Sequence, residues 1–412
     1  MTRTGYLAGA ALLCSALSTY AETGVTPEKV VLGQPAAFSG PSAGLGVEMW
    51  RGAWAAFQEA NDAGGVHGRK IQLVLADDAY DAERAAPAVT ELVRARVFAL
   101  FGGVGTPTIV KALPVVLENF NKDGLFYFAN FTGAQAQREA PFERCVFNLR
   151  ASYRQETEAM VAAFSAMGRR KIAIFVQDDA YGASGRDGVR RALAARNLSL
   201  VADTTYRRGQ RFEASTMTQV EAIRAAGAEA VIAVGAYQAC AAFVRDARNA
   251  GLTIPIHNVS FVGPDQMLAL LRDEEKRTGK RLTANLIVTQ VVPSYLDTRI
   301  PVVSAYRMAM NRYDPTIPPG IGDGSYRPGS RYSFGSLEGY VSAKAFLAVL
   351  RKVGPELTRK RFYETAESMG RFELGLEAPA EFSAGRHQAL DKVWFTYVAE
   401  SGWVTTRTAA LQ

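Results

Sequence analysis

The sequence predicts an α/β protein whose parallel sheets form two Rossmann-like lobes. Apolar strand-like runs alternate with amphipathic helical runs from Val30 onward, and a second such set begins after Arg150. Strands that alternate with helices usually pair in parallel, because each helix carries the chain back to the same edge of the sheet. The length of 412 residues is also more than one core usually holds, so the two sets indicate two lobes.

The first set contains strand-like runs with a helical run between each pair. The helical runs are amphipathic, which is the pattern of helices that cover a sheet. The first of them ends in two glycines, which fit a helix terminus. The expected strands cover 29–38, 70–78, 97–103 and 125–131, and the expected helices cover 46–65, 81–95 and 112–124.

The second set repeats the alternation and is followed by a long loop and a helix. Residues 316–332 are rich in Gly and Pro, so we expect a surface loop there, with a lid over a cleft as the alternative. A helix over 333–353 then begins with Ser333 or Ser336 as its N-cap. Before the loop, we expect helices over 156–168, 185–197, 217–227 and 240–251, and strands over 171–179, 198–206 and 228–236.

Residues 1–21 have the pattern of a secretory signal peptide. An Arg stands near the amino terminus, an apolar run covers about 6–17, and Thr19-Tyr20-Ala21 offers a small-residue cleavage site. The apolar run is shorter than the ~20 residues that cross a bilayer. We therefore expect a protein that is exported to the periplasm with this peptide removed.

The net charge and the cysteines place few restrictions on the function. The net charge is +7, but basic and acidic residues are interspersed, so the sequence does not indicate nucleic-acid binding. A positive field mildly favours anionic ligands. Cys145 and Cys240 lie in apolar stretches, which leaves both a disulfide and two buried free thiols open.

No set of catalytic or metal-ligating residues stands out. His67, His257 and His387 are far apart, and none has a partner at metal-ligand spacing. No G-x-S-x-G elbow is present. Asp77 and Asp78 are adjacent at a strand end, so their side chains point to opposite sides and form no ready dyad. We expect a protein that is not an enzyme and that uses no metal or cofactor.

A glycine-rich turn lies between the predicted strand at 97–103 and the helix that follows it. Gly102, Gly103 and Gly105 lead into Thr106, and such a turn directs backbone N–H groups and a helix dipole at one point. No Lys-Ser/Thr pair ends the turn, and the glycines lack the dinucleotide spacing, so neither phosphate-binding pattern is met.

The segments that follow the predicted strands are polar and aromatic, with few charges. Ligands of open α/β sheets bind beyond the carboxyl ends of the strands. A polar and aromatic cleft between two lobes favours binding of a small molecule over catalysis. These segments are 39–41, 77–80, 102–108, 130–134, 178–181, 235–237 and 262–265.

Ordered blocks of the sequence resemble a known family. The stretch SGPSAGLGVEMWRGAWAAFQEANDAGGVHGRKIQLVLADDAYDAERA is similar to the N-terminal signature of type I periplasmic solute-binding proteins, in the leucine/isoleucine/valine-binding branch that serves ATP-binding-cassette (ABC) importers. The family's later blocks resemble VFALFGGVGTPT, VFNLRASYRQETEAM, IAIFVQDDAYGASGRDGV and SFGSLEGYVSAKAF, in this order. The resemblance covers nearly the whole chain after residue 21.

The resemblance implies a Venus-flytrap fold in which two Rossmann-like lobes are joined by three crossing segments and trap a ligand by hinge closure. It implies a first lobe of residues 25–147 plus 294–371. The second lobe then comprises residues 148–293 plus 372–412.

The resemblance also implies a ligand site. Thr106 takes the position of a hydroxyl that binds the ligand carboxylate, and Asp265 takes that of a Glu that pairs with the ligand ammonium. In this family, two aromatic side chains of the second lobe close over the ligand. With the neighbouring residues of these blocks, the expected site consists of Ser39, Gly105, Thr106, Phe131, Thr132, Gly133, Tyr181, Tyr237 and Asp265.

The site implies a small carboxylate-bearing solute that a monomeric protein delivers to an inner-membrane ABC permease. Asp265 favours a ligand with an amine, such as an amino acid, because a buried carboxylate without a cation is costly. The rings of Phe131, Tyr181 and Tyr237 equally suit an aromatic or longer aliphatic acid. A ligand-sensing protein that presents its bound state to a membrane receptor is the alternative, and the sequence does not separate it from an importer component.

Overall fold

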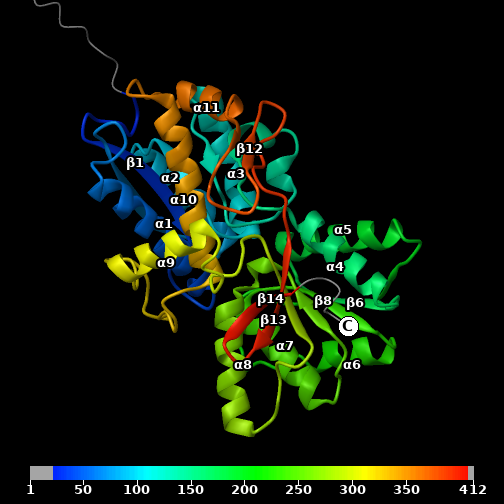
Figure 1. The fold of residues 1–412 in the computed structure, drawn as a ribbon. Coiled ribbons are helices and arrows are strands. Elements are labelled where there is room, and N and C mark those ends of the chain that lie inside the picture. Colours follow the sequence, from blue (N-terminus) through cyan, green and yellow to red (C-terminus); the bar gives the residue numbers. More distant parts are fainter. Residues whose placement is uncertain (1–21, 407–412) are drawn as a thin grey trace, which may run out of the picture.

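The structure is a computed structural model that describes residues 22–406. Two sheets form the cores of two lobes, which Figure 1 shows one above the other. Helices lie against both sheets, and this confirms the predicted two-lobe α/β fold. The predicted signal peptide at 1–21 lies outside the described residues.

A five-stranded parallel sheet forms the core of the first lobe. Its strands are β1 (Lys29–Ala36), β2 (Lys70–Asp77), β3 (Ala99–Phe101), β4 (Tyr127–Phe128) and β5 (Val146–Phe147). They lie in the order β2-β1-β3-β4-β5. Most of β1 is buried, as expected for a central parallel strand with helices on both sides.

The helices of the first lobe come from two distant parts of the chain. They are α1 (Ala43–Asp62), α2 (Ala82–Arg94), α3 (Thr106–Asp123), α9 (Pro301–Tyr313), α10 (Phe334–Val353) and α11 (Arg359–Glu367). Two short 3₁₀ helices, η1 (Ala136–Arg138) and η2 (Glu143–Cys145), lie between β4 and β5. In Figure 1 the yellow α9 and the orange α10 lie beside the blue α1, and α11 lies at the end of α10.

Glycines bring α1 and α10 into backbone contact. A Cβ on Gly52 would lie 1.6 Å from the Ser336 carbonyl oxygen. Likewise, a Cβ on Gly339 would lie 2.1 Å from the Met49 carbonyl oxygen. Each helix therefore presents a glycine to the backbone of the other, and this close contact joins the late helix to the first one.

The core of the second lobe is a seven-stranded sheet. Its strands are β6 (Ile172–Gln177), β7 (Leu200–Tyr206), β8 (Ala230–Val234), β9 (Ile256–Asn258), β10 (Leu286–Gln290), β13 (Trp394–Ala399) and β14 (Gly402–Thr406). They lie in the order β14-β13-β10-β9-β8-β6-β7. The strands β6 to β10 are parallel, as predicted for β6, β7 and β8, whereas β13 is antiparallel to β10 and β14 is antiparallel to β13. The strands β9 and β10 were not predicted. The sequence prediction did not include this antiparallel pair.

The helices of the second lobe follow the predicted alternation. They are α4 (Tyr153–Ala166), α5 (Ala180–Ala194), α6 (Met217–Ala225), α7 (Tyr237–Asn249) and α8 (Pro264–Thr278), with the short 3₁₀ helix η3 (Ser260–Val262) before α8. Ser152 caps α4 by accepting a hydrogen bond from the Gln155 backbone N–H, and the Gln155 side chain bonds back to the Ser152 N–H. This capping box fixes the point at which the chain enters the second lobe.

The chain crosses between the lobes three times, as the order of strands and helices requires. The first crossing follows β5 and the second follows β10. The hairpin of β11 (Gly370–Phe372) and β12 (Ala380–Phe382) then precedes the third crossing. The Phe382 ring lies 5.5 Å from that of Phe147 in the first lobe. We therefore propose that the first lobe extends to about Leu390, beyond the boundary at 371 expected from the sequence.

Two of the crossing segments run side by side as a parallel pair. Asn148 donates its N–H to the His387 carbonyl at 2.6 Å, and Leu390 donates to the Leu149 carbonyl at 2.8 Å. Asn148 and Gln388 form the corresponding bridge. This pair constitutes part of the hinge.

The two cysteines are buried free thiols, one in each lobe, so of the two alternatives the disulfide is not formed. The predicted loop at 316–332 has neither helix nor strand, and α10 begins after Ser333, whose hydroxyl accepts a hydrogen bond from the Ser336 N–H. Of the two candidates, Ser333 is therefore the N-cap.

The contact between α1 and α10 predicts a large effect of a single methyl group. We expect Gly52→Ala to lower the free energy of unfolding by about 1–3 kcal/mol, because the added carbon meets backbone atoms that cannot rotate away. Urea unfolding followed by circular dichroism measures the change. Gly385→Ala is the control, since a Cβ there has no neighbour within 4 Å and its φ is not positive. Equal stability of the two variants would contradict the contact.

Candidate functional site

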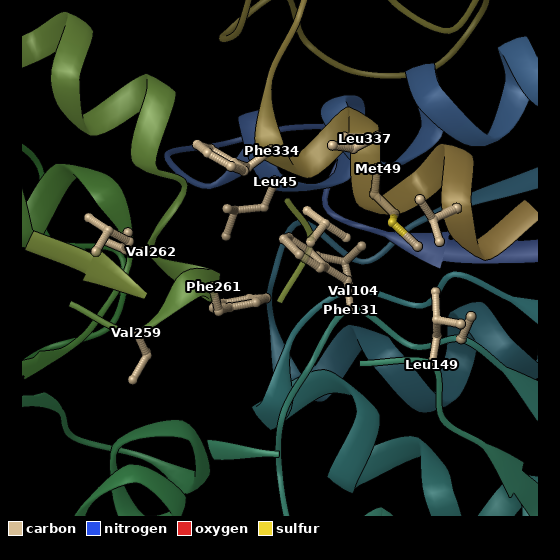
Figure 2. Close-up of a cluster of buried hydrophobic side chains, with 14 of the residues drawn as sticks. Leu45, Met49, Val104, Phe131, Leu149, Val259, Phe261, Val262, Phe334 and Leu337 are labelled. Atoms are coloured by element: carbon tan, nitrogen blue, oxygen red, sulfur yellow. The ribbon is translucent and has the colours of Figure 1, made fainter. Parts of the chain in front are cut away.

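Apolar side chains from both lobes meet between the lobes (Figure 2). Phe131 of the first lobe lies against Phe261 of the second, and both side chains are buried. The ring centroids of Phe131 and Phe261 lie 5.1 Å apart. The lobes are therefore closed on each other at the carboxyl ends of their strands, where ligands of such sheets bind.

The glycine-rich turn after β3 has a conformation that a residue with a side chain rarely adopts. Gly105 caps α3 with φ of 103°, and a Cβ on it would lie 2.4 Å from the Tyr80 ring. Its N–H donates to the Phe131 carbonyl at 3.2 Å, and Phe131 donates to the Gly103 carbonyl at 2.7 Å. These bonds hold the turn next to the 131–134 segment, so two of the predicted site segments lie side by side.

Three hydroxyl groups form a buried cluster at this place, which we call the hydroxyl cluster. Thr106 is the first residue of α3, and its Oγ1 lies 2.6 Å from Thr132 Oγ1. Each of these oxygens also lies 3.5 Å from Tyr153 Oη. Gly133 makes room for Tyr153, because a Cβ on the glycine would lie 2.5 Å from the tyrosine ring. Tyr153 begins α4, so the cluster joins the two lobes.

Aromatic rings close the site from the second lobe. The Tyr181 ring lies 5.2 Å from Tyr153 and 5.0 Å from Phe261. Across the cleft, the Tyr80 hydroxyl accepts a hydrogen bond of 3.1 Å from Gln177 Nε2. Tyr80 has φ of 60°, a left-handed conformation that non-glycine residues adopt mainly at turns and functional sites.

The tyrosine hydroxyls of the site remain protonated. Burial raises the pKa of Tyr153, and it raises the pKa of Tyr80 and of Tyr181 well above the usual value of a phenol. The hydroxyl cluster therefore offers neutral groups that can donate hydrogen bonds to an anionic ligand.

A buried arginine lies beside the hydroxyl cluster. Arg150 occupies the first crossing, and 1% of its side chain is exposed. Its guanidinium carbon lies 5.2 Å from the Phe131 ring centroid and 5.8 Å from that of Tyr153. Burial alone would lower the pKa of Arg150, but Glu338 and Glu156 together raise it above the usual value. The arginine therefore carries a full positive charge.

Asp265 lies at the other end of the cleft and is already hydrogen-bonded by the protein. Tyr295 donates its hydroxyl to Asp265 Oδ1 at 2.7 Å, and the Phe334 N–H donates to Oδ2 at 2.9 Å. Burial raises the pKa of Asp265 to about 7. In this conformation Asp265 connects α8 of the second lobe to the start of α10 in the first.

A hollow lies next to Asp265. It has a volume of about 470 Å³, and its lining includes Tyr237, Asp265, Gln266 and Tyr326. Tyr326 lies in the predicted loop, donates to Glu48 Oε1 of the first lobe at 2.7 Å and accepts from Gln266 Nε2 of the second at 2.9 Å. The loop thus bridges the two lobes beside this hollow.

The structure brings most of the predicted site residues together but separates three of them. Ser39 donates its hydroxyl to Asp77 Oδ2 within the first lobe. Tyr237 and Asp265 line the hollow beside Tyr326 and have no hydrogen bond to the hydroxyl cluster. Those that surround the hydroxyl cluster are Gly105, Thr106, Phe131, Thr132, Gly133 and Tyr181.

Four residues around the candidate site were not predicted from the sequence. Tyr80 belongs to the segment 77–80, which follows a predicted strand, so its position at a strand end could have indicated it. Tyr153 and Arg150 lie in a block that resembles the family, but nothing marked them as buried. Phe261 precedes a flagged segment by one residue.

Two kinds of feature are absent from residues 22–406. These residues contain no group of three or more His, Cys, Asp or Glu side chains that could hold a metal ion. None of their helices is long and apolar enough to cross a membrane.

Comparisons with known proteins agree with this architecture. The sequence pattern of a family described as periplasmic binding proteins matches residues 29–402. The crystal structure of a possible leucine/isoleucine/valine-binding protein from Rhodopirellula baltica is 32% identical, covers 93% of this chain and 98% of its own, and superposes with a TM-score of 0.82. An amino acid binding protein from Pseudomonas aeruginosa is 29% identical over 269 residues, which are 64% of this chain and 68% of that protein.

A more distant structure shares the fold. A branched-chain amino acid ABC transporter protein from Thermus thermophilus, crystallised with bound valine, is 15% identical and superposes with a TM-score of 0.78 over 92% of this chain and 96% of its own. The family match spans nearly all of residues 22–406, so the chain belongs to the periplasmic binding protein family of solute-binding proteins and is similar to its leucine/isoleucine/valine-binding members.

Proposed function

We propose that this protein is the periplasmic substrate-binding component of an ABC importer and that it binds a small carboxylate-bearing solute between its lobes. The hydroxyl cluster carries the proposal. Thr106 and Thr132 are fully buried, they lie at the positive end of the dipole of α3, and Tyr153 adds a donor from the other lobe. Neutral hydroxyls at a helix N-terminus are suited to a carboxylate, because they can donate hydrogen bonds to its oxygens.

Hinge closure is the mechanism that this arrangement supports. Thr106 and Thr132 belong to the first lobe, whereas Tyr153 and Tyr181 belong to the second. A ligand held by both sets gains its full contacts only when the lobes are closed, so its binding shifts the population toward the closed form. The direct bond between Gln177 and Tyr80 stabilises the same closed form.

The body of the ligand faces aromatic side chains. Phe131, Tyr181 and Phe261 lie around the hydroxyl cluster, and their rings suit an apolar side chain, an aromatic ring or an aliphatic chain. The proposed ligands are therefore amino acids and aromatic or aliphatic acids. The relatives named above support an amino acid, because one is called an amino acid binding protein and another holds valine.

A thermal-shift screen tests the proposal. The chain without residues 1–21 is melted in the presence of amino acids, aromatic acids and short aliphatic acids. A ligand at a hundredfold over its Kd adds about 2.7 kcal/mol of stability, which raises the melting temperature visibly. Stabilisation by none of these compounds would contradict the proposal.

Loss of one hydroxyl should weaken binding of the ligand found in that screen. Thr106→Val keeps the volume of the side chain and removes the donor. We therefore expect calorimetry to show binding that is weaker by about 1–3 kcal/mol. Thr90→Val is the control, because the Thr90 hydroxyl bonds to the Ala86 carbonyl within α2 and should not affect affinity. Equal affinity of both variants would remove Thr106 from the site.

Asp265 should make stability depend on pH. Its pKa is about 7 in the folded protein and near 3.8 in the unfolded chain, so between these values the folded state holds a proton that the unfolded state releases. The stability from this proton is complete below about pH 4 and is lost as the pH rises through 7. Asp265→Asn cannot titrate, so we expect a smaller loss of stability from pH 5 to pH 8 in urea unfolding than in the unmodified protein. Equal losses would show that Asp265 is ionised throughout.

A further inference from the structure

Arg138 of the first lobe, at the end of η1, reaches three separate segments of the chain. Its Nη1 donates to the Ala134 carbonyl at 2.6 Å and, more weakly, to the Thr132 carbonyl at 3.5 Å. Nη2 donates to the Arg150 carbonyl in the first crossing at 3.1 Å, and Nε donates to Gln388 Oε1 in the third crossing at 2.9 Å. One guanidinium therefore connects a segment of the candidate site to two crossing segments.

The acceptors of Arg138 are uncharged oxygens, namely three backbone carbonyls and one side-chain amide. Burial, and after it the nearby charge of Arg150, lowers the pKa of Arg138 to about 9, so the guanidinium remains charged at neutral pH. A charged donor forms stronger hydrogen bonds than a neutral one, and a planar guanidinium presents its donors in fixed directions. The connected segments are therefore held at defined relative positions.

The Gln388 side chain extends this connection to the second lobe. Its Nε2 donates to Gln155 Oε1 at 2.8 Å. The same oxygen accepts the Ser152 N–H at 2.7 Å in the capping box of α4. A chain of hydrogen bonds thus runs from Arg138 through Gln388 to the start of α4, where Tyr153 is the first residue.

The other end of this chain of hydrogen bonds is at the hydroxyl cluster. Arg138 bonds to the backbone of the segment that carries Thr132, whose Oγ1 lies 2.6 Å from Thr106 Oγ1 and accepts the Ala134 N–H at 3.2 Å. The position of the Thr132 hydroxyl therefore depends on the backbone that Arg138 holds. A ligand that bonds to this hydroxyl is connected through Arg138 to both crossing segments.

The side chains of this connection have room to rearrange when the hinge moves. A hollow of about 590 Å³ lies at the hinge, and its lining includes Arg138, Gln155 and Gln388. Asn148 and His387 of the paired crossing segments line it as well. Side chains that border a hollow can change partners without displacing the atoms of a close-packed core. The hydrogen bonds can therefore differ between the open and closed arrangements of the lobes.

We propose that Arg138 is a positioning residue that couples the Thr132 end of the candidate site to the hinge. It does not touch the ligand. It fixes the first-lobe part of the site relative to the crossing segments, so that contacts of a ligand with the hydroxyl cluster stabilise the closed arrangement of the lobes. This inference rests on the proposed function and adds to it the residue through which binding and closure are coupled.

Dissociation kinetics test the coupling on the chain from residue 22. Surface plasmon resonance on the immobilised protein measures association and dissociation of leucine, phenylalanine, benzoate and hexanoate, which represent the classes of the thermal-shift screen. We expect Arg138→Met to make dissociation about tenfold faster and to change association by at most about twofold, because the hydroxyls remain and only closure is impaired. An unchanged dissociation rate would overturn the proposal.

Arg248→Met is the matched control. Like Arg138, Arg248 donates to backbone carbonyls, which are those of Leu252, Ile254 and Ala284, and burial lowers its pKa to about 10. These contacts lie within the second lobe, so this variant should lose stability but keep the dissociation rate. If both variants released the probe faster to the same extent, Arg138 would act only through overall stability and the coupling would be refuted.

Gln388→Met covers the case in which Arg138→Met does not fold, as judged by circular dichroism. The Gln388 side chain bonds to Arg138, Gln155 and the Leu390 carbonyl, and to none of the three residues of the hydroxyl cluster. We expect it also to speed dissociation, and where both single variants fold, the double variant should show less than the product of their effects.

Two further outcomes separate this inference from the proposed function. Unchanged dissociation from Gln388→Met would overturn the coupling while the proposed function stands. If neither the four probes nor any other compound of the thermal-shift screen binds the unmodified protein, the proposed function itself fails.

Discussion

The hydrogen-bonded pair of crossing segments at the hinge is the constraint on which the site depends. The Asn148 and Leu149 backbones are held against the segment that runs from His387 to Leu390. Arg150, Ser152 and Tyr153 follow within the next few residues, so the arginine, the helix cap and one hydroxyl of the cluster are all positioned by this pair. A displacement of the hinge therefore changes the charge and the hydrogen-bond donors of the cleft together.

The proposed site draws its residues from both lobes, and the two sets differ in their dependence on closure. The threonine hydroxyls and the N-terminus of α3 form a rigid surface of the first lobe, because Gly105 and Phe131 fix the turn through backbone bonds. Tyr153 and Tyr181 belong to the second lobe. In the proposed mechanism the threonines bind the ligand while the lobes are apart, and the tyrosines add their contacts on closure, so that one small ligand couples to a large motion.

The alternation of strands and helices was enough to predict the fold, because each element carries its own periodic pattern. The pattern failed for β13 and β14, which complete the edge of a sheet after the alternation has stopped: β13 pairs with β10, more than a hundred residues earlier, and β14 pairs with β13. In the cleft, strand ends and the family resemblance led to Thr106, Thr132 and Tyr181. They did not lead to Arg150, because burial of an arginine depends on side chains such as Glu156 and Ser260, which only the tertiary structure brings together. The hydrogen bonds of Asp265 could not be predicted for the same reason, since its partners Tyr295 and Phe334 are remote in the sequence.

The order of the strands along the chain also determines when each lobe can be completed during synthesis. The core of the first lobe lacks α10 until residues after Phe334 have been made, and the second sheet lacks its edge strands until Trp394 and the residues after it have emerged. Neither lobe is a continuous piece of the chain, so the first cannot be completed before about residue 390 has been made, and the second cannot be completed before the last strands have been made. The chain can therefore reach its native state only after almost all of its residues have been made.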